Sequence, residues 1–450
     1  MTQLEEAVSR YHRSLDQNPE RLASWMGQLR EQFEARHLIV NGRPVTPVLR
    51  PHFLSRRQYS SLVKSSEALN SAIERVRTLA LGSPLLMARM EMLPAEKMLA
   101  TVDPGYSTPA VASLLETQVN NGSIHCAAAQ ADMPHGLVFG EILSDIFYDS
   151  PPVKEFRKKH KLVKAASSKP LITAMLKAWK EFGGRKQPTV AILEFRQPFA
   201  SFDSHEYTLL AELLRKHGLQ VEVVSPEQLD YRNDVLRRGD FAIDLVYRGV
   251  RAHEFLMRYD LTHPLVRAYR EHRVCVVNSF RTELTRKKAL LALLTDEVIS
   301  SSFPAVERNA IRDTIPWTRV VGQVKTTREG KTVDLPDYIR KNREKLVLRP
   351  NEDSGELHAT EGWRVDDTAW DRALRVALRN PFVVQERVDA RTVSFPVDLQ
   401  GDVAYRDLLV DVTPHSFLGK IHGCSSRISA PPGTFSTIAG LAPAFILEGK

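Results

Sequence analysis

The chain has 450 residues, of which 43% are apolar and 8% aromatic, and its net charge at neutral pH is +8. This length exceeds what one compact core usually holds, so we expect roughly two to four domains or subdomains. The apolar fraction is typical of a folded protein and excludes general disorder. No run approaches the roughly 18 apolar residues of a membrane helix, and the N-terminus lacks an apolar leader, which predicts a cytoplasmic protein with no membrane partner.

Cysteine spacing and charge distribution limit the classes of site. Cys126, Cys275 and Cys424 lie far apart without metal-binding spacing, as expected of packing residues in a reducing compartment. The basic excess is spread thinly, with one concentration, KEFRKKHKLVK, at 154–164. Such runs are usually solvated helix faces, so the basic composition alone does not favour a nucleic-acid partner.

The first third of the chain combines helical periodicity with one hairpin signal. The first 100 residues place apolar residues three and four apart, as in LASWMGQLREQFEARHLI, and predict a mainly helical region. The segment LLMARMEML at 85–93 suits either a core helix or a pocket wall, and the core is favoured. Between 114 and 133, two strand-like runs flank Asn120, Asn121 and Gly122, which predicts a hairpin.

Residues 188–280 alternate between strand-like and helix-like segments. TVAILEF and LQVEVV flank a helical segment that ends at Gly218, and FAIDLVYRG and RVCVVNSF follow as strands. This alternation predicts a parallel, Rossmann-like sheet covered by helices. Beyond it, residues 285–297 indicate one helix, and EKLVLRP, PFVVQERV, AYRDLLVDVTPH and HGCSSRIS indicate strands of an antiparallel C-terminal part.

The last third of the chain holds the types of group that ATP-dependent ligation requires. A lysine pair and a cation at a strand end would neutralise a triphosphate, and an acidic loop and a late aspartate would hold Mg²⁺. Taken singly, each motif has an ordinary structural alternative: solvent-facing lysines, a structural turn or a plain sheet strand.

Several motifs in order resemble the circularly permuted ATP-grasp proteins related to glutathionylspermidine synthase and eukaryotic-type glutathione synthetase. They are DLVYRGV (244–250), HPLVRAYREHRVCVVNSFRTELTRKKALLALLTDE (263–297), LVLRPNEDSG (346–355) and FVVQERV (382–388). The resemblance covers about residues 90–450. It implies a mixed α/β and α+β protein with a circularly permuted ATP-grasp fold, which joins a carboxylate to an amine through an acyl-phosphate and uses ATP and Mg²⁺.

The resemblance also implies four parts along the chain. We expect a helical N-terminal region over 1–100 and an ATP-grasp part with the metal-site strands over 101–187. A Rossmann-like substrate subdomain follows over 188–280, and the nucleotide-binding ATP-grasp part occupies 281–450.

The expected nucleotide contacts transfer position by position. Lys288, or its neighbour Lys287, matches the family's first ATP-contacting lysine. Arg349 stands where the family usually has a lysine before proline, and its fork would bind phosphate in a bidentate manner as a catalytic cation. The strand that meets adenine in the family matches three residues here: Gln385, Glu386 and Val388.

The phosphate-covering loop of the family matches residues 351–362, but this loop is poor in glycine. Asp353 stands at the acidic position that reaches Mg²⁺ in relatives, and Ser354 and Gly355 follow where the family has two or three glycines. Glycine lets backbone N–H groups approach phosphate closely. We therefore expect a weakened grip on ATP.

The metal-site strands of the family have also changed. An Arg-x-Asp on one strand and a Glu-x-Asn on its partner become, in this chain, Leu114, Glu116, Ala128 and Gln130. Glu116 and Gln130 still offer oxygen ligands for Mg²⁺ beside Asp353. Losing the arginine and one carboxylate predicts catalysis weaker by orders of magnitude, since charge stabilisation of this kind is worth a few kcal/mol per group.

Four further polar residues are candidates. Asp411 and Arg427 match the family's late acidic and Arg-Leu-Ser segments, which makes Asp411 a metal candidate and Arg427 a catalytic one. The alternative for this pair is a turn cap and a surface ion pair. Arg248 and Arg251 are candidates for binding substrate carboxylates, with a structural ion pair as the favoured alternative.

We expect an ATP-grasp ligase for small-molecule carboxylate and amine substrates. The alternative is a catalytically degenerate pseudoenzyme that serves as a nucleotide-binding or protein-interaction scaffold, which would explain Leu114, Ala128 and the glycine-poor loop together. Nucleic-acid binding rests on net charge alone and is least favoured. The placement of Glu116 and Gln130 relative to Asp353 separates the first two hypotheses.

Overall fold

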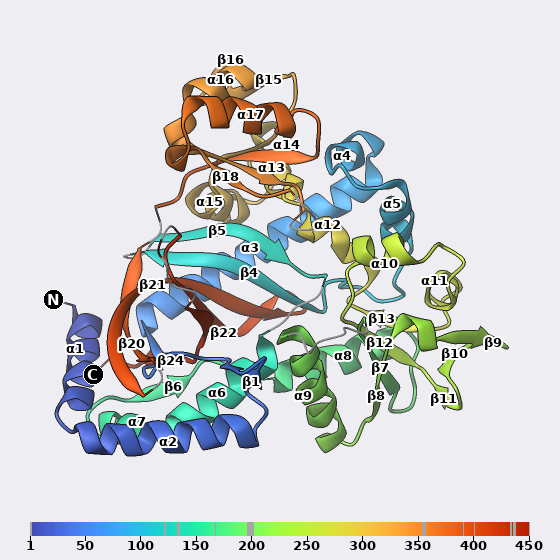
Figure 1. Ribbon diagram of the computed structural model, residues 1–450. Coiled ribbons are helices and arrows are strands. Elements are labelled where there is room, and N and C mark those ends of the chain that lie inside the picture. The colour runs from blue at the N-terminus through green and yellow to red at the C-terminus, as the bar shows by residue number, and fades with distance from the viewer. Residues whose placement is uncertain are drawn as a thin grey trace.

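The structure is a computed structural model that describes most of the chain (Figure 1). The described residues are 2–120, 123–132, 136–166, 168–195, 202–352, 357–389, 391–399, 401–432, 434 and 438–449. Three larger sheets organise it: a central antiparallel sheet, a parallel sheet at the lower right of Figure 1, and a smaller antiparallel sheet at the top.

The N-terminal region is mainly helical, as predicted. Its helices are α1 (Gln3–Asp16), α2 (Pro19–Ala35), α3 (Arg56–Gly82), α4 (Pro84–Arg89) and α5 (Pro94–Thr101). The side chains of Thr2 and Ser55 form capping boxes at the starts of α1 and α3. Within residues 85–93, Met87, Met90 and Met92 are buried in a hydrophobic cluster as favoured, whereas Leu85 and Leu93 are exposed.

Three short strands interrupt the helices and were not predicted. They are β1 (Ile39–Val40), β2 (Arg43–Pro44) and β3 (His52–Ser55). The β1–β2 hairpin turns through Asn41 and Gly42, both with positive φ, and Asn-Gly is the dipeptide that favours such tight turns. β3 pairs in parallel with β24 (Ala444–Leu447), which also pairs with β6 (Leu162–Lys164).

The central sheet joins segments from the two ends of the chain. Its strands are β4 (Ala112–Asn120), β5 (Ser123–Gln130), β20 (Thr392–Leu399), β21 (Asp402–Phe417), β22 (Lys420–Ser429) and β23 (Ala439–Ala442). The order is β23-β22-β21-β4-β5, with β20 also paired to β21, and all pairs are antiparallel. The predicted hairpin is confirmed as β4 and β5, while residues 121–122 of its turn lie outside the described residues.

Helices α6 (Leu137–Asp149), α7 (Pro151–Arg157) and α8 (Lys169–Glu181) connect the central sheet to the parallel one. The basic run at 154–164 is helical only as far as Arg157, because residues 162–164 form β6 beside β24. The expectation of one solvated helix over this run is therefore wrong in its second half.

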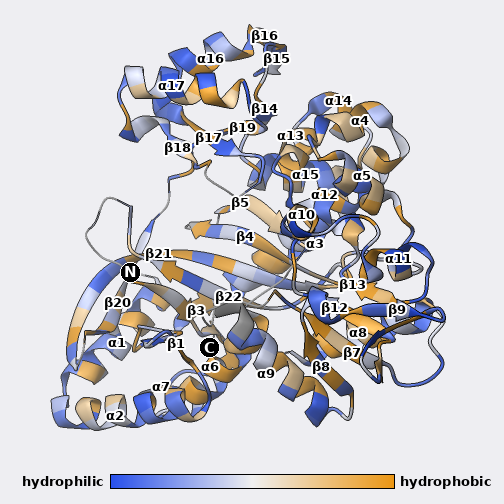
Figure 2. Ribbon diagram, turned by 45° about the vertical axis from the view of Figure 1, so that its right-hand side comes forward, coloured by the Kyte–Doolittle hydropathy of each residue, from blue (hydrophilic) through white to orange (hydrophobic). Residues whose placement is uncertain are grey.

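The predicted parallel sheet is confirmed in the order β13-β12-β7-β8. Its strands are β7 (Thr189–Leu193), β8 (Gln220–Val224), β12 (Leu245–Arg248) and β13 (Cys275–Val277), accompanied by helices α9 (Phe202–Lys216), α10 (Ala252–Arg258) and α11 (Pro264–Arg270). Figure 2 shows this sheet largely in apolar colours, whereas β21 alternates. Parallel sheets covered on both faces have this continuous apolar character. A small antiparallel sheet of β9 (Asp230–Arg232), β10 (Val235–Arg238) and β11 (Phe241–Ala242) precedes β12.

The third sheet carries the predicted nucleotide strands. It has the order β14-β19-β17-β18, with β14 (Thr318–Val320), β17 (Leu346–Pro350), β18 (Thr360–Glu361) and β19 (Phe382–Glu386). Around it lie the hairpin β15 (Lys325–Arg328) and β16 (Lys331–Asp334) and the helices α14 (Glu297–Ser300), α15 (Ala305–Thr314), α16 (Leu335–Lys341) and α17 (Asp367–Ala377).

The helix predicted over 285–297 is wrong as a single element. The chain forms α12 (Glu283–Arg286) and α13 (Ala289–Leu294), and Lys287 between them is extended, with ψ 125°. The backbone N–H of Lys288 donates to the carbonyl of Asn351 at 3.0 Å, and that of Ala289 to its side-chain Oδ1 at 2.8 Å. Asn351, just past β17, thus replaces the acceptors that a continuous helix would supply.

Within the described part of the chain, no helix has both the length and the apolar character needed to cross a membrane.

A buried ion pair ties the parallel sheet to α12. Arg248, at the end of β12, is fully buried, and its Nη1 lies 2.5 Å from Glu283 Oε1. Arg248 also donates to the carbonyls of Asn278 and Val250. Burial raises the pKa of Glu283 in spite of the arginine. The structural alternative for Arg248 is therefore confirmed.

We expect Arg248→Met to lower the free energy of unfolding by about 3–5 kcal/mol, because it leaves the Glu283 charge buried without its partner. Without the arginine, the raised pKa of Glu283 moves higher still, so the loss should shrink as the pH falls and the carboxyl becomes neutral. Urea unfolding at several pH values measures both effects. Arg248→Met combined with Glu283→Leu should recover much of the stability, and a loss below 1 kcal/mol in the single variant would contradict the pairing.

Candidate functional site

A cavity of about 780 Å³ lies over one face of the central sheet. Alternate residues of its strands form the floor, and the β1–β2 hairpin and the start of α10 form the sides. The polar lining residues are Asn41, Arg43, Glu116, Gln130, Arg251, Asp411, Thr413, Ser425, Arg427 and Ser429. The sheet therefore gathers acidic, amide, hydroxyl and cationic groups around one space.

Three of the predicted metal ligands line this cavity. Glu116 lies on β4, Gln130 on β5 and Asp411 on β21. Gln130 Nε2 donates a hydrogen bond to Glu116 Oε1. The fourth candidate, Asp353, lies outside the described residues with Ser354 and Gly355, so the distance test of the metal site stays a prediction.

The changed family positions face each other across the hairpin. Leu114 pairs with Gln130, and Glu116 pairs with Ala128. Leu114 lines the cavity at the position where the resemblance calls for arginine. An apolar side chain occupies that point, yet the cavity beside it stays open.

Asp411 and Arg427 lie opposite each other in the register of β21 and β22, and both line the same cavity. Asp411 lies within β21, so the turn-cap alternative for it is wrong. Burial raises the pKa of Asp411, and the negative charge of Glu116 adds to the effect, while a hydrogen bond from Gln118 and the charge of Arg427 oppose it. A cation placed between the two carboxylates would relieve this repulsion.

Arg349 connects the nucleotide sheet to the metal-site hairpin. Its Nη1 donates to the carbonyl of Ala127 and to Gln385 Oε1, both at 3.0 Å. Ala127 belongs to β5, the strand that ends at Gln130. In the part of the chain that the structure describes, Arg349 thus bonds to neutral oxygens.

The three predicted adenine contacts lie on or just beyond β19. Gln385 is buried and donates from Nε2 to Thr318 Oγ1 at 3.1 Å. The backbone N–H of Glu386 donates to Trp317, and its Oε1 accepts from Arg328 Nη2 at 2.7 Å. The backbone N–H of the next residue, Arg387, donates to the carbonyl of Lys345. Half-buried Val388 is therefore the first residue after the segment whose backbone N–H groups are hydrogen-bonded.

The lysine pair is buried, so the solvent-facing alternative is wrong for both residues: Lys287 and Lys288 are each 3% exposed. Lys287 Nζ lies 2.9 Å from Glu96 Oε2 and 2.7 Å from Glu352 Oε2. Its pKa is raised: burial opposes the charged form, but the two carboxylates outweigh burial.

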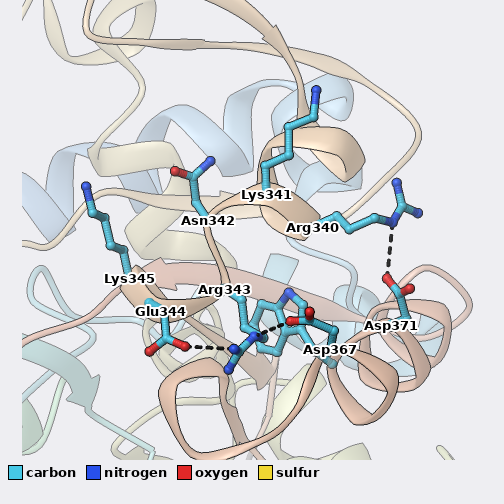
Figure 3. A pocket seen from close by; sticks show the side chains of 9 residues that line it. Arg340, Lys341, Asn342, Arg343, Glu344, Lys345, Asp367 and Asp371 are labelled. Carbon is cyan, nitrogen blue, oxygen red and sulfur yellow. Dashed lines mark hydrogen bonds and ion pairs between the residues drawn. The ribbon is translucent and has the colours of Figure 1, made fainter.

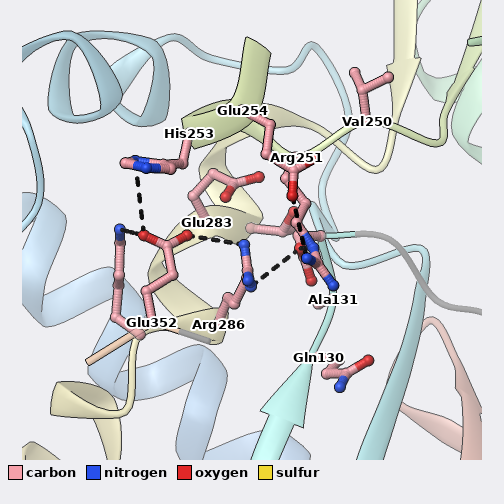
Figure 4. A network of polar contacts seen from close by, with 12 residues as sticks. Gln130, Ala131, Val250, Arg251, His253, Glu254, Glu283, Arg286 and Glu352 are labelled. Carbon is pink, nitrogen blue, oxygen red and sulfur yellow. Dashed lines mark hydrogen bonds and ion pairs between the residues drawn. The ribbon is translucent and has the colours of Figure 1, made fainter. Parts of the chain in front are cut away.

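Glu352 belongs to a network of charges that sequence reasoning missed (Figure 4). Arg286 Nη1 lies 2.8 Å from Glu352 Oε1, and Arg286 Nε lies 3.5 Å from Asp132. Burial alone would raise the pKa of Glu352, but Lys287 and Arg286 lower it. Arg286 and Lys287 are adjacent in the sequence, but Glu352 lies more than sixty positions away, so no local pattern predicted this network.

Among the described residues, Glu96, His253 and Glu352 form the group whose ligand atoms lie close enough for a metal ion. Because Lys287 Nζ contacts both carboxylates, a cation of the protein already occupies their shared space. We therefore interpret this group as a structural ion cluster.

Another cavity, of about 480 Å³, lies on the outer side of the third sheet (Figure 3). It contains none of the predicted site residues, and its arginines are paired: Arg340 with Asp371 at 3.1 Å and Arg343 with Asp367 at 2.8 Å. Exposed pairs of this kind contribute little energy. They are typical of a surface rather than of a binding site.

No protein-family model matches the chain, and no curated protein matches its sequence. Among solved structures, a glutathione synthetase-like effector from Globodera pallida in its apo form is similar, with a TM-score of 0.59 and 12% identity over 96% of this chain and 99% of that one. A putative γ-glutamylcysteine synthetase from Methylobacillus flagellatus gives a TM-score of 0.43 at 11% identity over 86% and 87% of the two chains. D-alanyl-alanine synthetase A from Vibrio cholerae gives 0.30 at 12% identity over 57% and 74%.

The first of these likenesses extends over nearly the whole of both chains, and it confirms the expected fold class. The circular permutation and the four predicted domain boundaries stay predictions. The chain has the mixed α/β fold of the glutathione synthetase-like effector.

Proposed function

We propose that the protein is an ATP-dependent carboxylate–amine ligase that forms an amide or peptide bond through an acyl-phosphate. The observation that carries the proposal is the meeting of Glu116, Gln130 and Asp411 in one cavity. Strands far apart in the sequence bring these oxygen ligands together, as a Mg²⁺ site requires. The fold is consistent with this chemistry but does not specify it.

The cavity residues fit Mg²⁺. Burial and the charge of Glu116 raise the pKa of Asp411, and a divalent cation would offset the cost of ionising it. In this proposal Glu116, Gln130 and Asp411 hold the metal, and Asp353 is the further ligand that the resemblance implies. Bound ATP would supply the phosphoryl group that activates the carboxylate.

The resemblance puts Lys288 first as the nucleotide lysine, and the contacts of Lys287 make that neighbour a poor alternative. Lys287 already pairs with Glu96 and Glu352, so a phosphate would have to displace two carboxylates to reach it. Arg349 suits a phosphate because its described contacts are neutral oxygens, which leave its charge available. The two residues would neutralise the triphosphate while Val388 meets adenine.

Cations at the cavity offset the arginine that Leu114 replaces. Arg43 from the β1–β2 hairpin, Arg251 from the start of α10 and Arg427 from β22 all line it, although Arg251 forms the favoured structural ion pair, with Glu254 at 3.2 Å. They would hold the substrate carboxylate and stabilise negative charge as it develops. A failure to bind ATP in the experiment below would favour the scaffold alternative instead.

We expect wild-type protein to bind ATP more tightly with Mg²⁺ than without it, and isothermal titration calorimetry measures both affinities. Arg349→Ala should weaken ATP binding about tenfold or more, because a charge-assisted contact to phosphate is lost. Asp411→Asn should remove most of the Mg²⁺ dependence and leave metal-free binding in place.

Arg340→Ala, on the outer cavity, is the matched control and should bind like wild type. If millimolar ATP fails to bind, the ligase proposal is wrong and the scaffold alternative holds. If ATP binds, phosphate release in the presence of mixed carboxylates and amines tests the reaction itself.

The lysine assignment makes a separate prediction. Lys287→Met should lower the free energy of unfolding by about 3–5 kcal/mol, because Glu96 and Glu352 lose a buried partner. Adding Glu96→Gln to this variant should recover part of the loss. Lys288→Met should instead weaken ATP binding, and an unchanged ATP affinity in this folded variant would refute the assignment.

A further inference from the structure

A second polar cavity, of about 490 Å³, lies on the opposite face of the central sheet. Val410 and Val412 of β21 line it, whereas Asp411 and Thr413 line the candidate active-site cavity. Successive side chains of a strand point to opposite faces, so the two cavities lie back to back across β21. Helix α1, which lies beside β20 in Figure 1, forms the outer wall with β3.

Arg50 is fully buried at this second cavity. Its Nη1 donates to the carbonyl of Pro51 at 2.8 Å and its Nη2 to that of Ser394 at 2.9 Å, while its Nε has no hydrogen-bond partner. The ring of Phe395 lies 4.1 Å from the guanidinium carbon. Burial lowers the pKa of Arg50 to about 10, so it stays charged at neutral pH.

The charge of Arg50 has no anionic partner within the described chain. The groups that act on it there are the Tyr11 and Tyr405 hydroxyls rather than a carboxylate. A buried charge without a counterion is costly. The cost would be offset by an anion that enters the cavity beside it.

Other lining residues indicate the shape of that anion. His12 Nε2 is buried without a partner, and burial, aided by the charge of Arg50, lowers the pKa of His12 to about 4. Arg391 lies exposed at the same cavity, and Glu5 there accepts the N–H of Thr2 in the capping box of α1. The apolar lining residues are Leu4, Val8, Phe53, Leu54, Val119, Val393, Val410 and Val412. The polar side chains include the cations Arg50 and Arg391, neutral His12 and the carboxylate of Glu5, and the apolar side chains are mainly aliphatic.

We propose that this cavity binds an amphiphilic carboxylate, with its head at Arg50 and His12 and its apolar body against the valines of β21. The volume lies within the range of about 300–1,000 Å³ that small-molecule sites occupy. The carboxylate supplies the counterion that Arg50 lacks. The aliphatic wall would contact an alkyl chain, so a ligand with such a chain should bind better than a small anion without one. The site is separate from the proposed ligase cavity and does not depend on the ligase function.

Octanoate is the probe, titrated calorimetrically into the full chain, with acetate, octanol and octyl phosphate as comparisons. We expect octanoate to bind at least about tenfold more tightly than acetate or octanol, because both the charge and the chain contribute. Equal affinity for acetate or octanol overturns the proposal. Octyl phosphate binding about tenfold more tightly than octanoate would assign the site to phosphate monoesters instead and also overturns it.

Val8→Glu adds a negative charge to the half-buried face of α1 and should weaken octanoate binding about tenfold or more. Arg10→Glu is the matched control, since Arg10 is exposed on the same helix and does not line the cavity. It should bind octanoate like wild type. Equal losses in both variants would mean a general charge effect and refute the site.

A local signal distinguishes this site from the nucleotide site. Octanoate should raise the pKa of His12, followed by NMR of its ring, because a carboxylate nearby favours the charged imidazole. The other groups acting on His12 are Arg50 and Asp16, and the Tyr405 ring lies tilted against its ring, with the centroids 4.9 Å apart. Arg349→Ala should leave the octanoate effect intact even if it abolishes ATP binding. Octanoate binding without a change at His12 would place the ligand elsewhere and overturn the proposal.

Discussion

β21 pairs with β4 on one side and with β22 on the other, and the position of Asp411 relative to Glu116 and Arg427 depends on this register. Val412 lies opposite Thr117 on β4, and Asp411 opposite Arg427 on β22. A slip of one residue would turn Asp411 to the other face of the sheet, toward the apolar valines and Arg50. The chain thus needs both of its ends, the β4–β5 hairpin and the C-terminal strands, before any metal site exists.

Buried charges join three further segments of the chain to one another. Glu96 comes from α5, Lys287 from the break before α13, and Glu352 from the end of β17. A buried ionic cluster is weak evidence of net stability, but loss of one member is costly. The cluster therefore fixes where the segment after Glu352 begins.

Local pattern predicted the elements whose signal is local. The alternation around 188–280 gave the parallel sheet, and the polar turn after Val119 gave the β4–β5 hairpin. The break at Lys287 could not be predicted, because its cause is Asn351, more than sixty positions away. The β1–β2 hairpin has strands too short for periodicity, although Asn41 and Gly42 were a usable turn signal. The charge partners of Lys287, and the lack of an anionic partner for Arg50 among the described residues, depend on tertiary packing. Neither has a pattern in the sequence.

The changes at the metal-site hairpin suggest a weakened site rather than a closed one. A closed site would have apolar side chains where the ligands of relatives meet, and Leu114 alone does not achieve this, since Glu116 and Gln130 stay paired beside it at an open cavity. The acidic and cationic groups around that space would be expensive to keep without a ligand, because Asp411 already has a raised pKa. A protein that only used the fold as a scaffold would have no reason to retain that cost. The balance of charge at the cavity therefore favours a ligand that carries both a cation for the carboxylates and an anion for the arginines, which is what a metal-bound carboxylate substrate provides.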